Sequence, residues 1–149
     1  MKLVQIALLT CAVVSANAFA QNLLLSCTVK GTNDTGALGP ETITVTVNNL
    51  KDFLHIDIDG PMDFQGGYST GSPENSVLKT EGVNLSDANN FTISSKRTMK
   101  ASGNIAETIV RINRSTGMFY LIERSTVGGL TLFKDINGPC TKITAKNRF

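Results

Sequence analysis

Alternation of apolar and polar residues with a period of two is the feature that most constrains this chain. It is clearest in segment 105–113, where Thr108, Val110 and Ile112 alternate with Ile109 and Arg111. Period two is typical of a β-strand with two unlike faces. Ser, Thr and Gly at 115–117 predict a tight turn, and a second strand follows in 118–124. The sequence therefore predicts an antiparallel hairpin.

The register of this hairpin can be predicted from the cross-strand pairs. A four-residue loop places Ile112 opposite Phe119, Val110 opposite Leu121, Arg111 opposite Tyr120 and Glu107 opposite Arg124. A three-residue loop instead places Arg111 opposite Leu121 and Ile109 opposite Glu123. Matched pairs contribute ~0.2–1 kcal/mol each, and a slip of one residue changes all of them. We therefore predict the four-residue loop.

Further strands are expected along the chain, with no helical periodicity between them. Gly31–Pro40, the stretch 60–73 and Asn137-Gly138-Pro139 read as loops or turns. The expected strands are 23–30, 41–48, 52–59, 76–81, 91–97, 105–113, 118–124 and 130–134. About eight short strands separated by turns are typical of an all-β domain, either a small antiparallel barrel or a β-sandwich. We favour the barrel, because closure removes exposed sheet edges.

The first 20 residues have the pattern of a cleaved signal peptide. Lys2 is followed by a mostly apolar stretch and then by Ala18-Phe19-Ala20, a small-x-small cleavage pattern. The apolar stretch is shorter than the ~20 residues that a membrane span needs. We therefore expect a single domain, 21–149, in the periplasm or secreted, with no membrane span after cleavage. A short signal with one Lys suggests a bacterial source.

Two cysteines remain after cleavage, Cys27 and Cys140, near the two ends of the mature chain. In an exported protein an even pair predicts a disulfide. A metal pair or a redox site is disfavoured, because the chain has no C-x-x-C motif and only one histidine, His55.

Loss of Lys2 leaves 13 basic against 12 acidic residues, which argues against nucleic acid as a partner.

Candidate functional residues are few. Phe64 and Tyr68 lie among glycines, which suggests a flexible binding loop, against the alternative of a disordered or loosely packed connection. Lys96, Arg97, Arg111 and Arg114 concentrate basic charge in the second half of the chain, with Lys100 and Arg124 nearby. They suggest an anion-binding face, against the alternative of a solvated face paired with Glu107 and Glu123.

Catalytic and metal patterns are incomplete. His55 and Asp57 share a strand face, but no glycine-flanked nucleophile accompanies them, so a solvated histidine is the alternative. Asp57, Asp59 and Asp63 are similar to part of a calcium loop that lacks its third ligand and its final Glu. We therefore expect no enzyme activity, no cofactor and no metal.

Two short patterns carry a family resemblance. Ile112-x-Arg114-x-Thr116-Gly117, followed by Gly138-x-Cys140, resembles small exported proteobacterial proteins of unknown function. Ala101-Ser102-Gly103 is similar to a fragment of the periplasmic C-type lysozyme inhibitors, whose following Tyr and Lys-Gly are absent here.

The function expected from these patterns is a non-catalytic binding or accessory role in the bacterial envelope, with a protein or a small molecule as partner. The alternatives are a carrier of a small apolar ligand inside the barrel and an inhibitor of a secreted hydrolase such as lysozyme.

Overall fold

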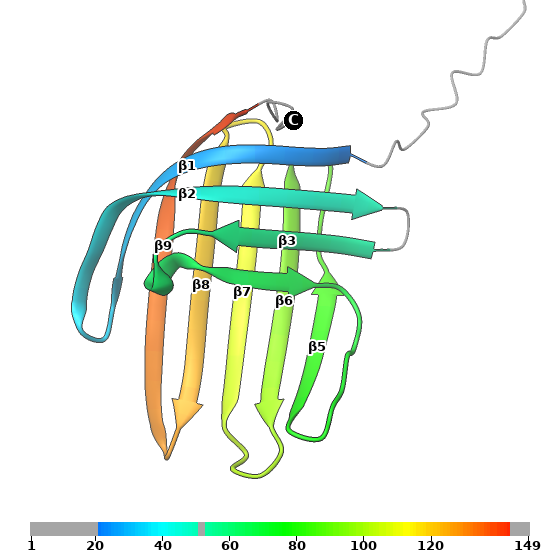
Figure 1. The fold of residues 1–149 in the computed structure, drawn as a ribbon, viewed down its shortest axis with the longest axis vertical. Helices are drawn as coiled ribbons and strands as arrows, with labels where there is room; N and C mark the ends of the chain where they lie inside the picture. The colour runs from blue at the N-terminus through cyan, green and yellow to red at the C-terminus, as the bar shows by residue number, and fades with distance from the viewer. Residues whose placement is uncertain (1–20, 51–52, 144–149) are drawn as a thin grey trace, which may run out of the picture.

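The structure, a computed structural model, describes residues 21–50 and 53–143, so the predicted signal peptide lies outside the described residues. Within these ranges nine strands form one antiparallel sheet and no α-helix is present (Figure 1). The strands are β1 (Gln21–Asn33), β2 (Gly36–Leu50), β3 (Phe53–Asp59), β4 (Gly66–Ser69), β5 (Leu78–Asn84), β6 (Asn90–Met99), β7 (Ile105–Asn113), β8 (Met118–Val127) and β9 (Leu130–Lys142). One 3₁₀ turn, η1 (Met62–Phe64), precedes β4.

The sheet curls into a nearly closed barrel, which confirms the predicted fold class. Consecutive strands pair, and β1 also pairs with β9, so the order is β4-β3-β2-β1-β9-β8-β7-β6-β5. In Figure 1, β1 to β4 run across the front of the long strands β5 to β9. The first and last strands therefore lie side by side within the sheet, and the seam of the barrel falls between β4 and β5.

Few contacts bridge this seam. Gly71 and Gly82 exchange two backbone hydrogen bonds, of 2.9 and 2.6 Å. The Arg97 guanidinium on β6 donates a hydrogen bond of 2.7 Å to the Gly67 carbonyl on β4. The segment that follows β4 thus pairs with β5, here and again between Glu74 and Lys79, and one side chain of β6 bonds to β4.

The predicted hairpin register is confirmed. Ile112 lies opposite Phe119, Val110 opposite Leu121, Arg111 opposite Tyr120 and Glu107 opposite Arg124. Gly117 has a φ of 67°, a conformation that L side chains rarely adopt and that closes the turn into β8.

The core lies where the two layers cross. One face of each strand points inward, which buries alternate apolar residues and leaves the threonines of β2 outside. The largest fully buried side chains are Phe119, Ile43, Leu54, Ile56, Ile93, Ile112, Leu121 and Ile136. Cys27 and Cys140 lie opposite each other on β1 and β9, with their sulfurs at disulfide-bonding distance, as predicted.

Parts of the predicted breaks are strand instead, as β4 is within the stretch 60–73. The stretch 31–40 belongs mostly to β1 and β2, which continue to a turn at Asp34 and Thr35. Gly138 and Pro139 lie within β9. A Cβ at Gly138 would collide with the Thr28 carbonyl oxygen of β1, so this glycine allows a close approach of two paired strands rather than a turn.

Candidate functional site

The inner face of the long strands changes from apolar to polar at one line of cross-strand neighbours. Ile93, Val110, Leu121 and Ile136 form a buried apolar line across β6 to β9. The next inward-facing line is Ser95, Thr108, Glu123 and Lys134, which we call the inner polar row. Ser95 and Thr108 are only 4% and 6% exposed. Polar groups therefore face the interior of the barrel at the end that lies away from the core.

Tyr68 and Arg97 complete the wall beside this row. The Arg97 guanidinium carbon lies 5.6 Å from the centroid of the Tyr68 ring, within cation–π range. Burial and the negative charge of Glu123 raise the pKa of Tyr68 to about 12, against a smaller opposing effect of Arg97.

A hollow of about 280 Å³ opens between the inner polar row and the turn that joins β1 to β2. We call it the end hollow; its lining residues are Asn33, Asp34, Thr35, Glu123, Ser125, Leu132, Phe133 and Lys134. Asp34 accepts a hydrogen bond of 2.8 Å from the Phe133 backbone N–H, which fixes the turn against β9. The end hollow is thus shaped by two elements that lie far apart in sequence.

Glu123 and Lys134 form a weak ion pair in the end hollow. Nζ of Lys134 lies 4.0 Å from Oε2 of Glu123, and the two side chains are only 24% and 28% exposed. The Ser125 hydroxyl donates to Oε1 of Glu123 over 3.3 Å. At such distances both charges keep hydrogen-bonding capacity for a further partner.

The four basic residues predicted to form an anion face do not share one surface. Lys96 lies on the outer face, 3.3 Å from Glu107, whereas Arg97 points inward. Arg111 shares the outer face with Tyr120. The Arg114 guanidinium carbon lies over the Phe91 ring, 4.8 Å from its centroid. The expectation of a single basic face is therefore wrong, because neighbouring residues of a strand point to opposite sides.

The expectation of a flexible loop exposing Phe64 and Tyr68 is also wrong. Phe64, in η1, is 4% exposed and Tyr68, on β4, is 6% exposed, and both belong to the core cluster. In this glycine-rich stretch, η1 carries the Phe64 ring and the short strand β4 carries the Tyr68 ring over the interior. The glycines make room for them: a Cβ at Gly66 would lie 2.8 Å from the Tyr68 hydroxyl oxygen.

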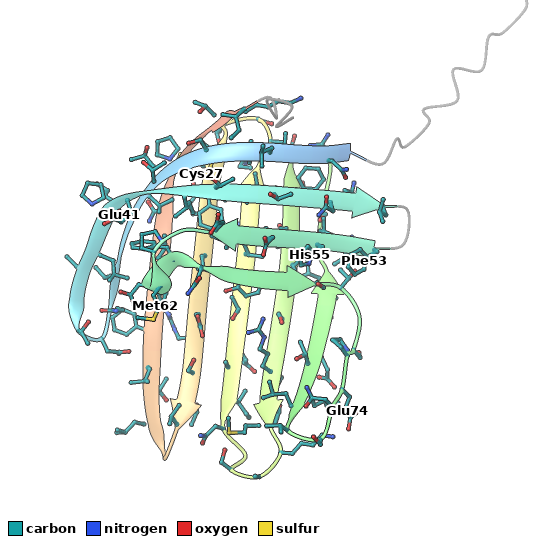
Figure 2. The ribbon with its side chains drawn as sticks, viewed as in Figure 1. Cys27, Glu41, Phe53, His55, Met62 and Glu74 are labelled. Atoms are coloured by element: carbon teal, nitrogen blue, oxygen red, sulfur yellow. A yellow bond between two sulfur atoms is a disulfide. The ribbon has the colours of Figure 1, made fainter. Side chains whose placement is uncertain are left out.

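His55 has a partner that the sequence did not reveal. Its Nδ1 lies 2.6 Å from the Ser69 hydroxyl of β4, and the Phe53 ring stacks on it with centroids 6.1 Å apart. Figure 2 shows both rings on β3. Among the described residues no carboxylate hydrogen-bonds to the His55 ring, and no group of three or more His, Cys, Asp or Glu side chains is placed to hold a metal.

The end hollow was missed at the level of sequence. Extending the predicted hairpin register from Val110 and Leu121 places Thr108 and Glu123 on the inner face, so the signal was present in the alternation. The contribution of Asn33 and Asp34 depends on the turn between β1 and β2, which only the tertiary structure places there.

No protein-family model, curated protein or solved structure matches the chain. Within residues 21–50 and 53–143, no helix has the length and hydropathy of a membrane span.

Proposed function

We propose that this chain is an exported, non-catalytic binding protein of the bacterial envelope and that the end hollow is its binding site. The observation that carries the proposal is the change from apolar to polar along the inner face of β6 to β9. Inward-facing polar groups cost stability unless they find partners, and departures from the local pattern tend to occur at functional sites.

Export is supported by the sequence and by the cysteine pair. The pattern of residues 1–20 is typical of a cleaved signal, and Cys27 lies at bonding distance from Cys140. Disulfides persist mainly in oxidising compartments such as the bacterial periplasm.

A role as carrier of an apolar ligand is not favoured. That role needs an apolar cavity inside the barrel, whereas buried side chains such as Phe119, Leu54 and Ile136 occupy the crossing of the two layers. Close packing of this kind leaves little room for a ligand. The end hollow instead combines Leu132 with charged and hydroxyl groups.

Inhibition of a secreted hydrolase is a second candidate, favoured by one observation. The turn between β6 and β7 carries Ala101, Ser102 and Gly103, all exposed, at the tip of two long strands. An exposed hairpin tip can enter an enzyme cleft. This candidate is tested by mixing the purified protein with lysozyme and measuring the residual cell-wall hydrolysis. Unchanged hydrolysis would exclude inhibition of that enzyme.

The binding role is tested by native mass spectrometry of the protein taken from its own envelope without reduction. A bound small molecule adds mass, and a protein partner appears by pull-down. Leu132→Trp fills the end hollow, and we expect it to abolish either association. Thr131→Trp is the matched control, because Thr131 is exposed and its side chain points to the opposite face of β9. Binding that survives Leu132→Trp would place the site elsewhere.

A further inference from the structure

The charges around the end hollow do not balance. Its charged lining residues are Asp34, Glu123 and Lys134, two carboxylates against one ammonium. One oxygen of Asp34 accepts from the Phe133 N–H, and among the described residues no hydrogen bond uses the other. The hollow therefore presents one net negative charge and a carboxylate oxygen directed at no protein donor.

Glu123 is also only partly neutralised. Its ion pair with Lys134 spans 4.0 Å, at the outer limit for such a contact, and the hydrogen-bond donor to it from the described part of the chain is the neutral hydroxyl of Ser125. Thr108, its neighbour in the inner polar row, is a polar residue that is only 6% exposed. Among the described residues Glu123 therefore has no charged donor closer than the Lys134 ammonium at 4.0 Å.

The Tyr68 hydroxyl lies beside this row. Burial is the main cause of its raised pKa, and the charge of Glu123 raises that pKa further, by more than Arg97 lowers it. A negative charge in this position disfavours a further anion and favours a cation.

We propose that the end hollow binds an alkylammonium group, with Glu123 and Asp34 as its acceptors and Leu132 in contact with its aliphatic chain. This inference rests on the proposed binding function and names its ligand class. The same chemistry is offered by a lysine side chain of a partner protein and by a small primary amine. Lys134 then acts as an internal competitor, because its ammonium already occupies the position opposite Glu123.

The test is an NMR titration of the full mature chain with Nα-acetyl-lysine amide as the ammonium probe. We expect saturable amide shifts confined to the neighbourhood of Ser125, Leu132 and the turn at Asp34. The matched neutral probe, with its side-chain nitrogen acetylated, removes the charge and keeps the aliphatic chain. We expect it to bind about tenfold more weakly or not at all, since charge-assisted hydrogen bonds are the stronger class.

Substitutions that remove a charge from the end hollow should change ammonium binding in a predictable direction. Glu123→Gln and Asp34→Asn keep the shape and the local hydrogen bonds, and each should weaken ammonium binding by about tenfold. Lys134→Met should strengthen it, because it removes the internal competitor. Asp135→Asn is the control for charge, since Asp135 faces outward beside Ile122, and it should leave binding unchanged.

Two further titrations identify the source of the ammonium group. Saturation by n-butylamine indicates a small amine, and binding of only a lysine-bearing peptide indicates a protein partner; either supports the proposal. Binding of acetate that Lys134→Met abolishes would overturn it, and so would the absence of shifts with every ammonium probe. If no ammonium probe binds but Leu132→Trp still abolishes association with a native partner, the end hollow is a binding site for a ligand of another class. The proposed binding function would then stand and the ammonium proposal would fail.

Discussion

Cys27 and Cys140 are directly opposite each other across the β1–β9 pair, with Cα atoms 3.9 Å apart and a sequence separation of 113. The pair joins β1 to β9 in the middle of the sheet, where the first and last strands lie side by side. Most cross-links of this span act by restricting the unfolded chain.

We expect the variant Cys27→Ala/Cys140→Ala to fold but to lose about 2–5 kcal/mol of unfolding free energy, the usual cost of removing a disulfide from a small exported domain. Urea unfolding of both proteins measures the difference. A reducing agent should destabilise the natural chain to the level of the variant and leave the variant unchanged. An equal midpoint for the two oxidised proteins would show that the pair contributes nothing.

Arg97 is predicted to hold the seam between β4 and β5. Its hydrogen bond to the Gly67 carbonyl is charge-assisted, but the side chain is exposed, so we expect Arg97→Ala to cost about 1 kcal/mol. The sharper readout is hydrogen exchange, which should accelerate in β4 and at Gly71 and Gly82. Lys96→Ala, on the opposite face of the same strand, is the control and should leave that exchange unchanged.

Gly138 is predicted to be required for the close approach of the paired strands β1 and β9. A Cβ there would collide with backbone atoms of Thr28 and Val29, which cannot move aside as a side chain can. Gly138→Ala should therefore cost at least the ~1–3 kcal/mol typical of overpacking. Gly67→Ala is the control, because its added Cβ would meet no atom closer than 3.4 Å. Thermal unfolding compares the two, and equal melting temperatures would contradict the prediction.

The alternation of residues explains how much of this fold could be predicted. The β7–β8 register followed from complementary pairs on both faces, such as Val110 with Leu121 and Arg111 with Tyr120. The local sequence was misleading at Gly138 and Pro139, because a glycine needed for the close approach of two paired strands has the same local pattern as a turn. Likewise the glycines around Tyr68 concealed β4.

The candidate site was harder to predict from the sequence, for a different reason. Alternation assigns Thr108 and Glu123 to the inner face, but it does not say where the covering layer ends. That boundary depends on how β1 to β4 cross the long strands, which is set by contacts far apart in sequence (Figure 1). The contact between Asp34 and Phe133, 99 residues apart, is of this kind.

Tyr68 should make stability depend on pH in the alkaline range. Its pKa is about 12 in the folded protein against an ordinary value of 10.0, a difference of ~3 kcal/mol. Because the folded value is the higher one, the contribution is fully present below pH 10 and is lost as the pH rises towards 12. Tyr68→Phe should remove this loss.

Ultraviolet titration of tyrosinate and unfolding at several alkaline pH values measure the two effects. Glu123→Gln should lower the pKa of Tyr68, since the carboxylate contributes to raising it, whereas Glu107→Gln, on the outer face, should not. A Tyr68 that ionises with its ordinary pKa in the natural protein would contradict the prediction.

Ser69 is expected to be unreactive, although its hydroxyl lies 2.6 Å from Nδ1 of His55. Activation of a serine needs a base that is itself oriented by a third group, and no carboxylate among the described residues bonds to this imidazole. The pair joins β3 to β4 directly opposite each other, so we expect Ser69→Ala to cost about 1 kcal/mol of stability. Incubation with a fluorophosphonate and intact-mass measurement should show no adduct; an adduct absent from Ser69→Ala would identify a serine hydrolase instead.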